Sequence, residues 1–271
     1  MLKEIAGIRE SSKLLEQLSL EQSSGELEAQ YQRAKPYPYV TIDNMFPAAL
    51  LNRVLAEMTP SEQAKWIYHN TRECDKLGQK SAASLGEAGY ELASLLHSAP
   101  FLYLLSEITG IWNLLPDPYM HGAGYSIIPS DGKFDVHVDL NADTTIGLTR
   151  RLVLIIYLNA NWRPEYGGQL ELWSQDASRK VCAIEPVFNR TLLMEISDLN
   201  FHGIAPVTEP TGRSRCSFMV YYNTAGEILG KDAGVHSSMY APACYRQKQT
   251  ASKIARRWLP PAIFDRIRHS R

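Results

Sequence analysis

The chain has 271 residues, of which 45% are hydrophobic and 21% charged, and its formal net charge at neutral pH is −1. This balance fits an enzyme with one principal domain and indicates neither specific nucleic-acid binding nor an acidic partner. No run of 18 apolar residues is present, and the first ten residues carry charges where a signal peptide needs its apolar core, so we expect a cytoplasmic protein.

The four cysteines, Cys74, Cys182, Cys216 and Cys244, lie far apart in the sequence. No two of them have the short spacing that is typical of zinc modules, and four thiols in a chain of this length do not indicate a disulfide framework. We therefore expect them to be reduced.

The first segment, residues 1–35, is predicted to be an N-terminal helical extension. Leu2, Ile5 and Ile8 recur at helical spacing, which favours one or two amphipathic helices. Such helices would either cap the core or provide the contact of a homodimer.

A Pro-Tyr-Pro step at residues 36–38 ends this extension. A short strand is predicted at residues 39–42, followed by a helix that begins at Pro47 and ends near Met58. Residues 84–110 have the apolar periodicity of a long helix or a helix pair, split near Pro100.

From Tyr119 to Asn223, short β-rich runs alternate with turns containing Gly, Pro, Asn and Asp. This pattern is typical of antiparallel sandwiches and barrels and differs from repeating βαβ units. We predict a mainly β fold with flanking α-helices, a double-stranded β-helix (jelly roll). Its domain spans residues 36–225, with a catalytic core at 119–223.

The last segment, residues 226–271, is predicted to be a basic helical tail. Within it, residues 245–271 hold eight Lys or Arg and a single acidic residue, Asp265, with apolar residues on both sides of Pro260 and Pro261. Two short amphipathic helices fit this pattern. They would either dock on the domain or contact an anionic surface.

Three residues in the β-rich region have the types and spacing of a metal site. His137 and Asp139 are two apart in a strand-like run, so both side chains point to the same face. His202 follows 65 residues later. Two imidazoles and one carboxylate can occupy one face of an iron ion and leave its other positions open.

The stretch from Tyr125 to Asn223 resembles the 2-oxoglutarate/Fe(II)-dependent dioxygenases, most closely their prolyl 4-hydroxylase-like branch. The resemblance rests on His137-Val138-Asp139, on Arg150-Arg151-Leu152-Val153-Leu154-Ile155-Ile156-Tyr157-Leu158-Asn159 with Trp162 behind it, on Gly167-Gly168-Gln169-Leu170-Glu171-Leu172, and on His202-Gly203-Ile204-Ala205-Pro206-Val207 leading to Gly212 and Arg215.

The resemblance implies Fe(II), 2-oxoglutarate and O₂ as cofactor and co-substrates, and it leaves ascorbate open as a reductant. His137, Asp139 and His202 are then the metal ligands and the catalytic centre. Arg215 is implied to bind the distal carboxylate of 2-oxoglutarate, with help from the Tyr157 hydroxyl. Arg213, two residues away on the same strand face, is the rival for this role.

The chain also departs from the prolyl hydroxylase pattern. That branch often has a second co-substrate-binding tyrosine before the His-x-Asp motif, but the candidate positions here are Ile127 and Ile128. Either Tyr125 or Tyr119 substitutes, or the contact is missing.

Loops at the mouth of the barrel would supply the substrate contacts, for which the sequence offers Asn141, Arg150 and Trp162. His121 and His236 are candidates for supporting the metal ligands or for facing the substrate.

The expected function is hydroxylation of a prolyl residue in a protein or peptide, or of an amino-acid-like or other small metabolite, with release of succinate and CO₂. Two alternatives remain open at this point. A cupin-like metalloenzyme would share the barrel and the histidines but would not need Arg215. A non-catalytic binding protein would be expected to have lost a metal ligand, whereas all three are present.

Overall fold

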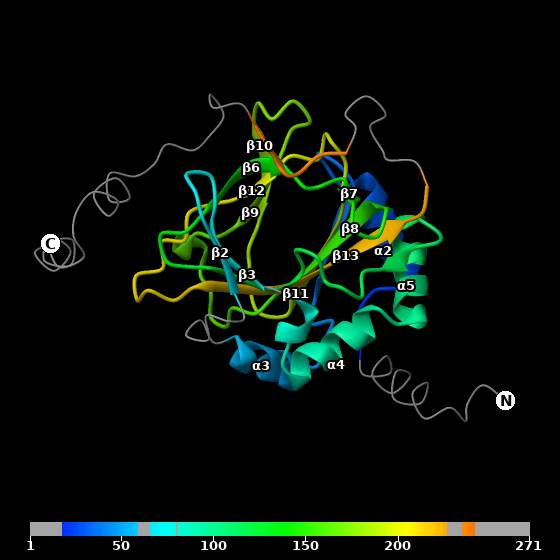
Figure 1. Ribbon diagram of the computed structural model, residues 1–271, viewed down its shortest axis with the longest axis horizontal. Helices are drawn as coiled ribbons and strands as arrows, with labels where there is room; N and C mark the ends of the chain where they lie inside the picture. Colours follow the sequence, from blue (N-terminus) through cyan, green and yellow to red (C-terminus); the bar gives the residue numbers. More distant parts are fainter. Residues whose placement is uncertain (1–17, 59–65, 80, 227–234, 242–271) are drawn as a thin grey trace, which may run out of the picture.

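Two antiparallel sheets form the body of the protein, and helices cover one side of the larger sheet (Figure 1). The computed structural model describes residues 18–58, 66–79, 81–226 and 235–241. The predicted helices in residues 1–17 and 245–271 lie outside these ranges. No described helix is long and apolar enough to cross a membrane.

The larger sheet has the order β1-β11-β8-β13-β5-β3-β2, with β4 beside β13 and β7 beside β8. Its described strands are β1 (Tyr39–Asp43), β2 (Trp66–Asn70), β3 (Asp75–Gln79), β4 (Leu115–Pro116), β5 (Gly124–Ile128), β7 (Ala142–Asp143), β8 (Leu148–Tyr157), β11 (Arg190–Glu195) and β13 (Arg215–Thr224). The smaller sheet has the order β10-β9-β12-β6-β14. It comprises β6 (Phe134–Val138), β9 (Leu170–Trp173), β10 (Lys180–Ile184), β12 (His202–Ile204) and β14 (Met239–Tyr240).

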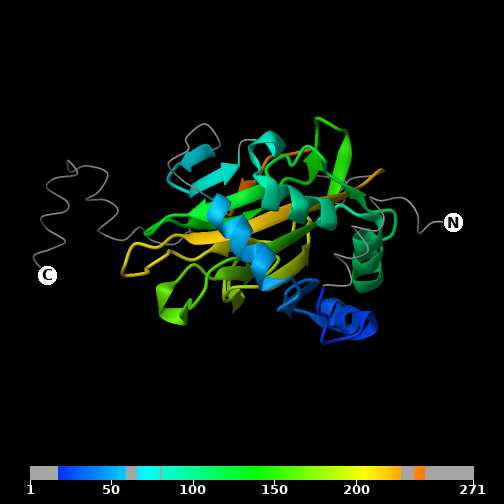
Figure 2. The ribbon, with the colours of Figure 1, turned by 90° about the horizontal axis from the view of Figure 1, so that it is seen from below.

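The helices lie mainly against the larger sheet, and Figure 2 shows α3 and α4 side by side across it. The described helices are α2 (Ser24–Arg33), α3 (Ala48–Glu57), α4 (Glu87–Leu96) and α5 (Ala99–Thr109), with short 3-10 turns η2 (Ala82–Ser84) and η3 (Pro164–Tyr166). Their apolar faces and the sheet share one hydrophobic core. The predicted jelly roll with flanking helices is confirmed.

Local chemistry explains where several elements begin and end. The predicted strand at 39–42 is β1, and the helix predicted to begin at Pro47 is α3. The predicted helix pair is α4 and α5. Ser98 separates them and caps α5 by accepting a hydrogen bond from the Phe101 amide. Pro100 lies in the first turn of α5, where its missing N–H costs nothing.

Strand β8 lies in the middle of the larger sheet, between β11 and β13, and all but two of its ten side chains are buried. One face packs under the helices and the other lines the space between the two sheets. This explains its nearly continuous apolar sequence, Leu152 to Tyr157.

Part of the segment predicted as a helical tail is a strand. Met239 and Tyr240 form β14, which pairs with Val138 and His137 of β6. The chain thus returns from the larger sheet to the edge of the smaller one, beside a predicted metal ligand. The helical periodicity lay further along the sequence, so it gave no signal for this pairing.

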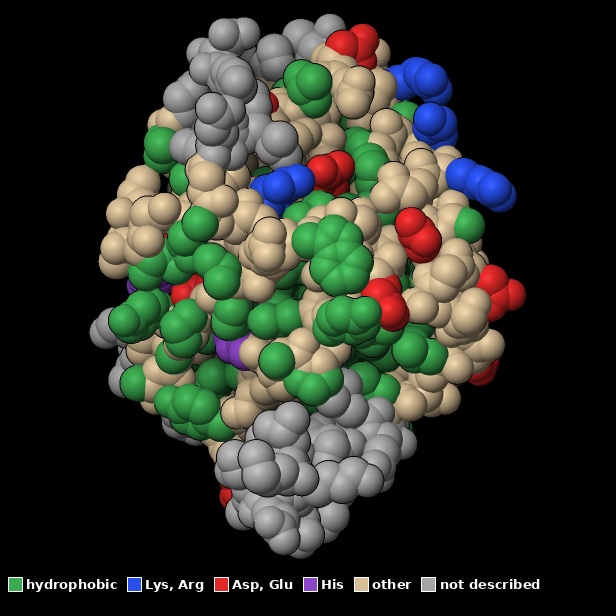
Figure 3. All heavy atoms as spheres, turned by 90° about the vertical axis from the view of Figure 1, so that its right-hand side faces the viewer, with side chains coloured by type: hydrophobic (Ala, Val, Ile, Leu, Met, Phe, Trp, Pro, Cys, Tyr) green, Lys and Arg blue, Asp and Glu red, His purple; other side chains and the backbone are tan. Residues whose placement is uncertain are grey.

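The side of the molecule on which α2 and α5 lie has a partly apolar surface. Figure 3 shows hydrophobic side chains gathered on this face with acidic side chains between them. Exposed aromatic residues of the protein include Tyr103 and Trp112, whose rings pack edge to face at 5.6 Å. Such surface is common on folded proteins and does not by itself identify a partner.

Candidate metal centre and co-substrate site

The pairing of two strands in the smaller sheet brings the predicted metal ligands together. β6 ends with His137 and Val138, Asp139 follows directly, and His202 is the first residue of β12, in register opposite His137. The Asp139 Oδ1 atom lies 3.4 Å from His137 Nε2 and 3.7 Å from His202 Nε2. All three side chains are buried, and their ligand atoms are close enough to hold one metal ion.

Hydrogen bonds to main-chain carbonyls orient both imidazoles. His137 Nδ1 donates to the Asp135 carbonyl at 2.8 Å, and His202 Nδ1 donates to the Asn200 carbonyl at 3.1 Å. The proton of each neutral ring is therefore on Nδ1, and the Nε2 lone pair points toward Asp139. His137 Nε2 is buried and has no hydrogen-bond partner. A metal ion would satisfy this atom.

The electrostatics favour the protonation states that bind metal. Burial lowers the pKa of His202 to about 4, so this ring is neutral at physiological pH. Burial by itself would raise the pKa of Asp139, but His202 and His137 together outweigh it and hold this pKa below its usual value. A neutral imidazole beside an ionised carboxylate is the form that accepts a divalent cation.

The strand that carries His137 is supported from both sides. The Phe134 ring stacks on the His137 ring at 3.8 Å between centroids, and the Tyr240 ring of β14 lies 6.0 Å away. The buried ammonium of Lys133 pairs with the Asp135 carboxylate, while the Asp135 carbonyl accepts the His137 proton. These contacts fix the orientation of the ligand.

Arg215 provides an anion site between the sheets. It is 1% exposed at the start of β13, its Nε donates to the Gly168 carbonyl at 2.9 Å, and its Nη1 contacts Ser217 Oγ at 3.4 Å. The Tyr157 ring lies under the guanidinium, 4.9 Å from its carbon. Arg215 Nη2 and the Tyr157 hydroxyl are both buried without a hydrogen-bond partner.

A buried guanidinium without an acid partner is costly, and none of the described carboxylates pairs with Arg215. The distal carboxylate of 2-oxoglutarate offers the two acceptor oxygens that Nη2 and the Tyr157 hydroxyl lack. The residues present therefore fit both the metal and the co-substrate that the sequence resemblance implies.

Arg213 is placed differently from Arg215. Its Nε lies 3.2 Å from Glu209, its side chain is 45% exposed, and it stacks over the Trp162 ring at 5.5 Å. Glu209 already neutralises its charge, so Arg213 does not face the interior with a free guanidinium.

The predicted substrate residues have different surroundings. Arg150 is 4% exposed and lies over the Tyr221 ring at 4.0 Å, and its Nε and Nη1 have no hydrogen-bond partner. Its Nη2 donates to the His121 carbonyl at 2.7 Å. Arg150 thus has buried donors near the metal centre, since its charge is among those that lower the Asp139 pKa.

Asn141 and Trp162 use their polar atoms within the protein. Asn141 donates to Asp198 at 3.3 Å and accepts from the His236 amide at 3.2 Å. The Trp162 indole donates to the Gly167 carbonyl at 3.0 Å and thereby holds the turn before β9. Substrate contacts from these two residues stay a prediction.

The other two histidines flank the site. His236 Nε2 lies 2.8 Å from Asp198, in the segment that leads to β14. His121, with Asp117 and Asp143, forms a second group that could hold a metal. However, the Asp117 carboxylate already accepts main-chain N–H groups of residues 119–121, and Asp143 accepts that of Thr145. These carboxylates shape loops.

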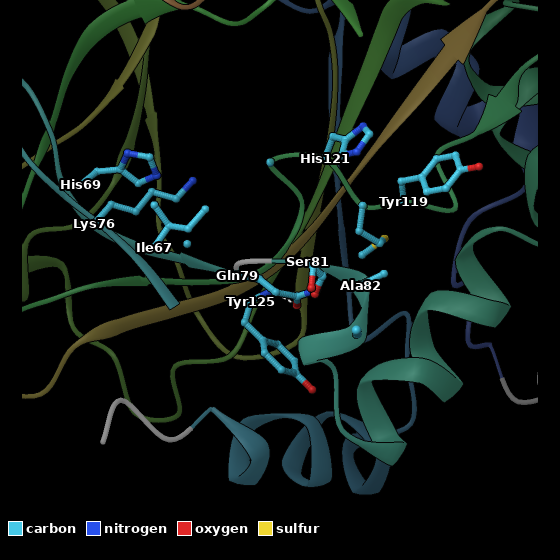
Figure 4. Close-up of a pocket in the computed structure, with 13 residues that line it drawn as sticks. Ile67, His69, Lys76, Gln79, Ser81, Ala82, Tyr119, His121 and Tyr125 are labelled. Carbon is cyan, nitrogen blue, oxygen red and sulfur yellow. Dashed lines mark hydrogen bonds between the residues drawn. The ribbon is translucent and has the colours of Figure 1, made fainter. Parts of the chain in front are cut away.

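Neither tyrosine that was expected to replace the missing co-substrate contact points toward Arg215. Tyr125 donates its hydroxyl to Glu57 at 2.5 Å, and Figure 4 shows it directed toward the helices. Tyr119 is 58% exposed and stacks on His121. Alternation along β5 explains this, because Tyr125 and Ile127 face the helices while Ser126 and Ile128 face the interior.

A cavity of about 630 Å³ lies between the β2–β3 hairpin and the loop before β5, and none of the residues that line it is a metal ligand or belongs to the Arg215 anion site. Residues of β2, β3, η2 and the loop before β5 line it, among them Ile67, His69, Lys76, Gln79 and His121. Neither His69 nor Lys76 was predicted to be a site residue. Both lie on a hairpin about 60 residues before the His-x-Asp motif, and only the pairing of β3 with β5 brings them to the barrel.

We expect Tyr157→Phe to weaken 2-oxoglutarate binding about 10-fold, because the lost hydroxyl is a partner for the distal carboxylate. The protein without co-substrate should not lose stability, since the hydroxyl is buried and has no partner there. Isothermal titration gives the first quantity and thermal unfolding the second. A large fall in the melting temperature would instead assign the hydroxyl to the fold.

Comparisons with known proteins agree with this geometry. The model of the 2OG-Fe(II) oxygenase superfamily matches residues 120–223, which contain every residue described above as a metal ligand or anion site. None of the curated proteins is significantly similar in sequence.

Several solved structures share the fold. A prolyl-4-hydroxylase from Pseudomonas putida has a TM-score of 0.54 and 18% identity, with 75% of this chain and 100% of that chain covered. A prolyl hydroxylase from Trichoplax adhaerens, solved with a hypoxia inducible factor oxygen degradation domain peptide fragment, has a TM-score of 0.53 and 19% identity, over 80% of this chain and 91% of that one. A prolyl 4-hydroxylase from Phytophthora capsici has a TM-score of 0.54 and 18% identity, over 90% and 72%.

Proposed function

We propose that the chain is a 2-oxoglutarate-dependent Fe(II) dioxygenase that hydroxylates a prolyl residue of a protein or peptide, which the match of residues 120–223 to the 2OG-Fe(II) oxygenase superfamily supports. One oxygen atom of O₂ enters the substrate C–H bond. The other enters succinate as 2-oxoglutarate loses CO₂. The observation that carries this proposal is a buried His/Asp/His group in the smaller sheet together with a buried Arg215 in the larger sheet that has no acid partner among the described residues.

Each residue of the site has a defined task in this reaction. Fe(II) with 2-oxoglutarate and O₂ supplies an oxidant that attacks unactivated C–H bonds. His137, Asp139 and His202 would hold the ion, and a site with three protein ligands would leave room for the co-substrates. Arg215 and Tyr157 hold the distal carboxylate and so fix which way 2-oxoglutarate points. The two sheets keep bulk water away from these groups.

The substrate side of the proposal rests on the cavity and on Arg150. The cavity opens to the surface where Ile67 and Tyr119 are exposed, which suits an extended peptide better than a fully enclosed metabolite. The unpartnered Nε and Nη1 of Arg150 can donate to a substrate carbonyl near the metal. Asn141 would act by holding Asp198 and the segment at His236 in place, and Trp162 by holding the turn before β9.

The prolyl preference has its support in the fold neighbours, two of which are prolyl 4-hydroxylases and one a prolyl hydroxylase bound to a peptide fragment. An amino-acid-like metabolite is the second candidate, because Arg150 and the cavity could also hold a single small molecule. We also propose a cytoplasmic location, for which the support is that the three described cysteines are free thiols.

The proposal is tested in two steps. Metal-free protein receives Fe(II) and then 2-oxoglutarate without O₂, and a visible absorption band reports chelation. With O₂, proline-containing peptides and free amino acids are screened by mass spectrometry for a gain of one oxygen, with succinate measured in parallel. Oxygen gain on a peptide prolyl residue supports the proposal. Gain only on free amino acids favours the second candidate, and absence of the band despite bound metal contradicts the dioxygenase mechanism.

A further inference from the structure

Lys76 is a cationic side chain near the site that has no role in the proposed reaction. Lys76 lies on β3, which pairs with β5 so that Leu77 is opposite Ile127 and Gly78 opposite Ser126. The same register, continued by one residue, places Lys76 beside Ile128 of β5. On the other side of β5, Ile128 pairs with Arg215 of β13. Lys76 and Arg215 therefore flank the same position of β5.

Lys76 points into the space between the two sheets. It lines the cavity, and Figure 4 shows it and His69 projecting from the hairpin on the same side. Its Nζ lies 3.9 Å from the Met219 sulfur and 6.0 Å from the centre of the Phe134 ring, the ring that stacks on His137. The Lys76 ammonium is thus close to β13, the strand that carries Arg215, and to the ring that supports the metal ligand His137.

Among the described residues, none neutralises the charge of Lys76. No carboxylate of the described residues forms an ion pair with it, and its hydrogen-bond partner is a thioether, a weak acceptor. Burial lowers the pKa of its ammonium, Asp139 acts against this and Arg215 adds to it. Lys76 thus carries an ammonium that has no counter-ion among the described residues and lies next to the Met219 sulfur and the Phe134 ring.

We propose that Lys76 binds a carboxylate of 2-oxoglutarate, as the second co-substrate contact that the prolyl hydroxylase pattern assigns to a tyrosine hydroxyl. Ile128 occupies a candidate position for that tyrosine. The Lys76 ammonium, on the neighbouring strand β3, would take the place of the tyrosine hydroxyl. This inference rests on the proposed use of 2-oxoglutarate. It assigns a binding role to the β2–β3 hairpin, which lies outside the matched residues 120–223.

The test is a Lys76→Met variant, which keeps the length and apolar stem of the side chain and removes the charge. Anaerobic Fe(II)-loaded protein is titrated with 2-oxoglutarate, followed by the visible band and by calorimetry. A lost charge-assisted hydrogen bond should raise the Kd for 2-oxoglutarate about 10- to 100-fold. The affinity for Fe(II) should stay unchanged, and Lys76→Arg should recover most of the co-substrate affinity.

Lys180→Met is the matched control. Lys180 lies on β10, pairs with Glu171 at 2.9 Å and is half exposed, so its loss should leave the Kd for 2-oxoglutarate as in the wild type. Thermal unfolding of each variant checks the fold. If Lys76→Met does not fold, Lys76→Gln takes its place, since it keeps a polar end without the charge.

The outcomes separate this inference from the proposed function. Wild-type protein that binds Fe(II) but forms no band with 2-oxoglutarate would contradict the dioxygenase chemistry itself. A normal wild-type band with the same Kd in the folded Lys76 variants would overturn only the role of Lys76, and would leave the ammonium to an anionic group of the substrate.

Discussion

Arg215→Leu should weaken 2-oxoglutarate binding about 100- to 1,000-fold, because the charge-assisted hydrogen bond from Nη2 and the positive charge that faces the distal carboxylate are lost together. Fe(II) binding should persist, since Arg215 is not a ligand. Without co-substrate, the free energy of unfolding should not fall, because the substitution removes a buried charge that has no acid partner. Anaerobic titration measures the binding, and chemical denaturation measures the stability.

Arg213→Leu is the matched control for this prediction. The two arginines are two residues apart on the chain, but Arg213 is paired with Glu209 and largely solvated. Its loss should change the 2-oxoglutarate affinity less than about threefold, since the Arg213 guanidinium is bonded to Glu209 and the Ala160 carbonyl and is not a free donor for the co-substrate. Equal losses in both variants would mean that the co-substrate does not lie against β13 as described.

His202→Ala should reduce Fe(II) affinity about 100-fold or more and abolish substrate-dependent succinate formation, because one of three ligands disappears and the other two cannot hold the ion in place. The fold should survive, since the imidazole makes a single hydrogen bond to a loop carbonyl. Equilibrium dialysis with metal analysis gives the affinity, and circular dichroism checks the sheets.

His121→Ala distinguishes the two groups that could hold a metal. If the metal binds at His137, Asp139 and His202, this variant should keep its Fe(II) affinity, because His121 belongs to the group whose carboxylates already accept main-chain hydrogen bonds. Retention of iron by His202→Ala together with loss of iron by His121→Ala would move the metal centre to the loop site.

The sequence was most informative where a local pattern decides the structure. The alternation of side chains along a strand places His137 and Asp139 on one face. This placement does not depend on contacts with distant parts of the chain. Pro47, Ser98 and Pro100 mark helix starts by the same local chemistry. These features needed no knowledge of distant contacts.

Contacts made through strand pairing could not be predicted in this way. Tyr125 was expected to be a substitute for the missing tyrosine, but a shift of one residue along a strand turns a side chain to the opposite face. Lys76 comes close to the site only because β3 pairs with β5. No local sequence pattern predicts which strand β3 pairs with. Likewise, β14 contains only two residues, too few for a periodic signal.

The position of His137 and His202 on adjacent paired strands has a thermodynamic consequence. A metal bound by both rings cross-links β6 and β12, and it can do so only in the native state. Loading is then linked to folding: at a free metal concentration of 100 times the Kd, the native state gains about 2.7 kcal/mol relative to the unfolded chain. Removing the metal with a chelator would thus lower the free energy of unfolding by the same amount and leave the protein folded, and the smaller sheet would be affected most because the larger sheet has its helices and core to hold it.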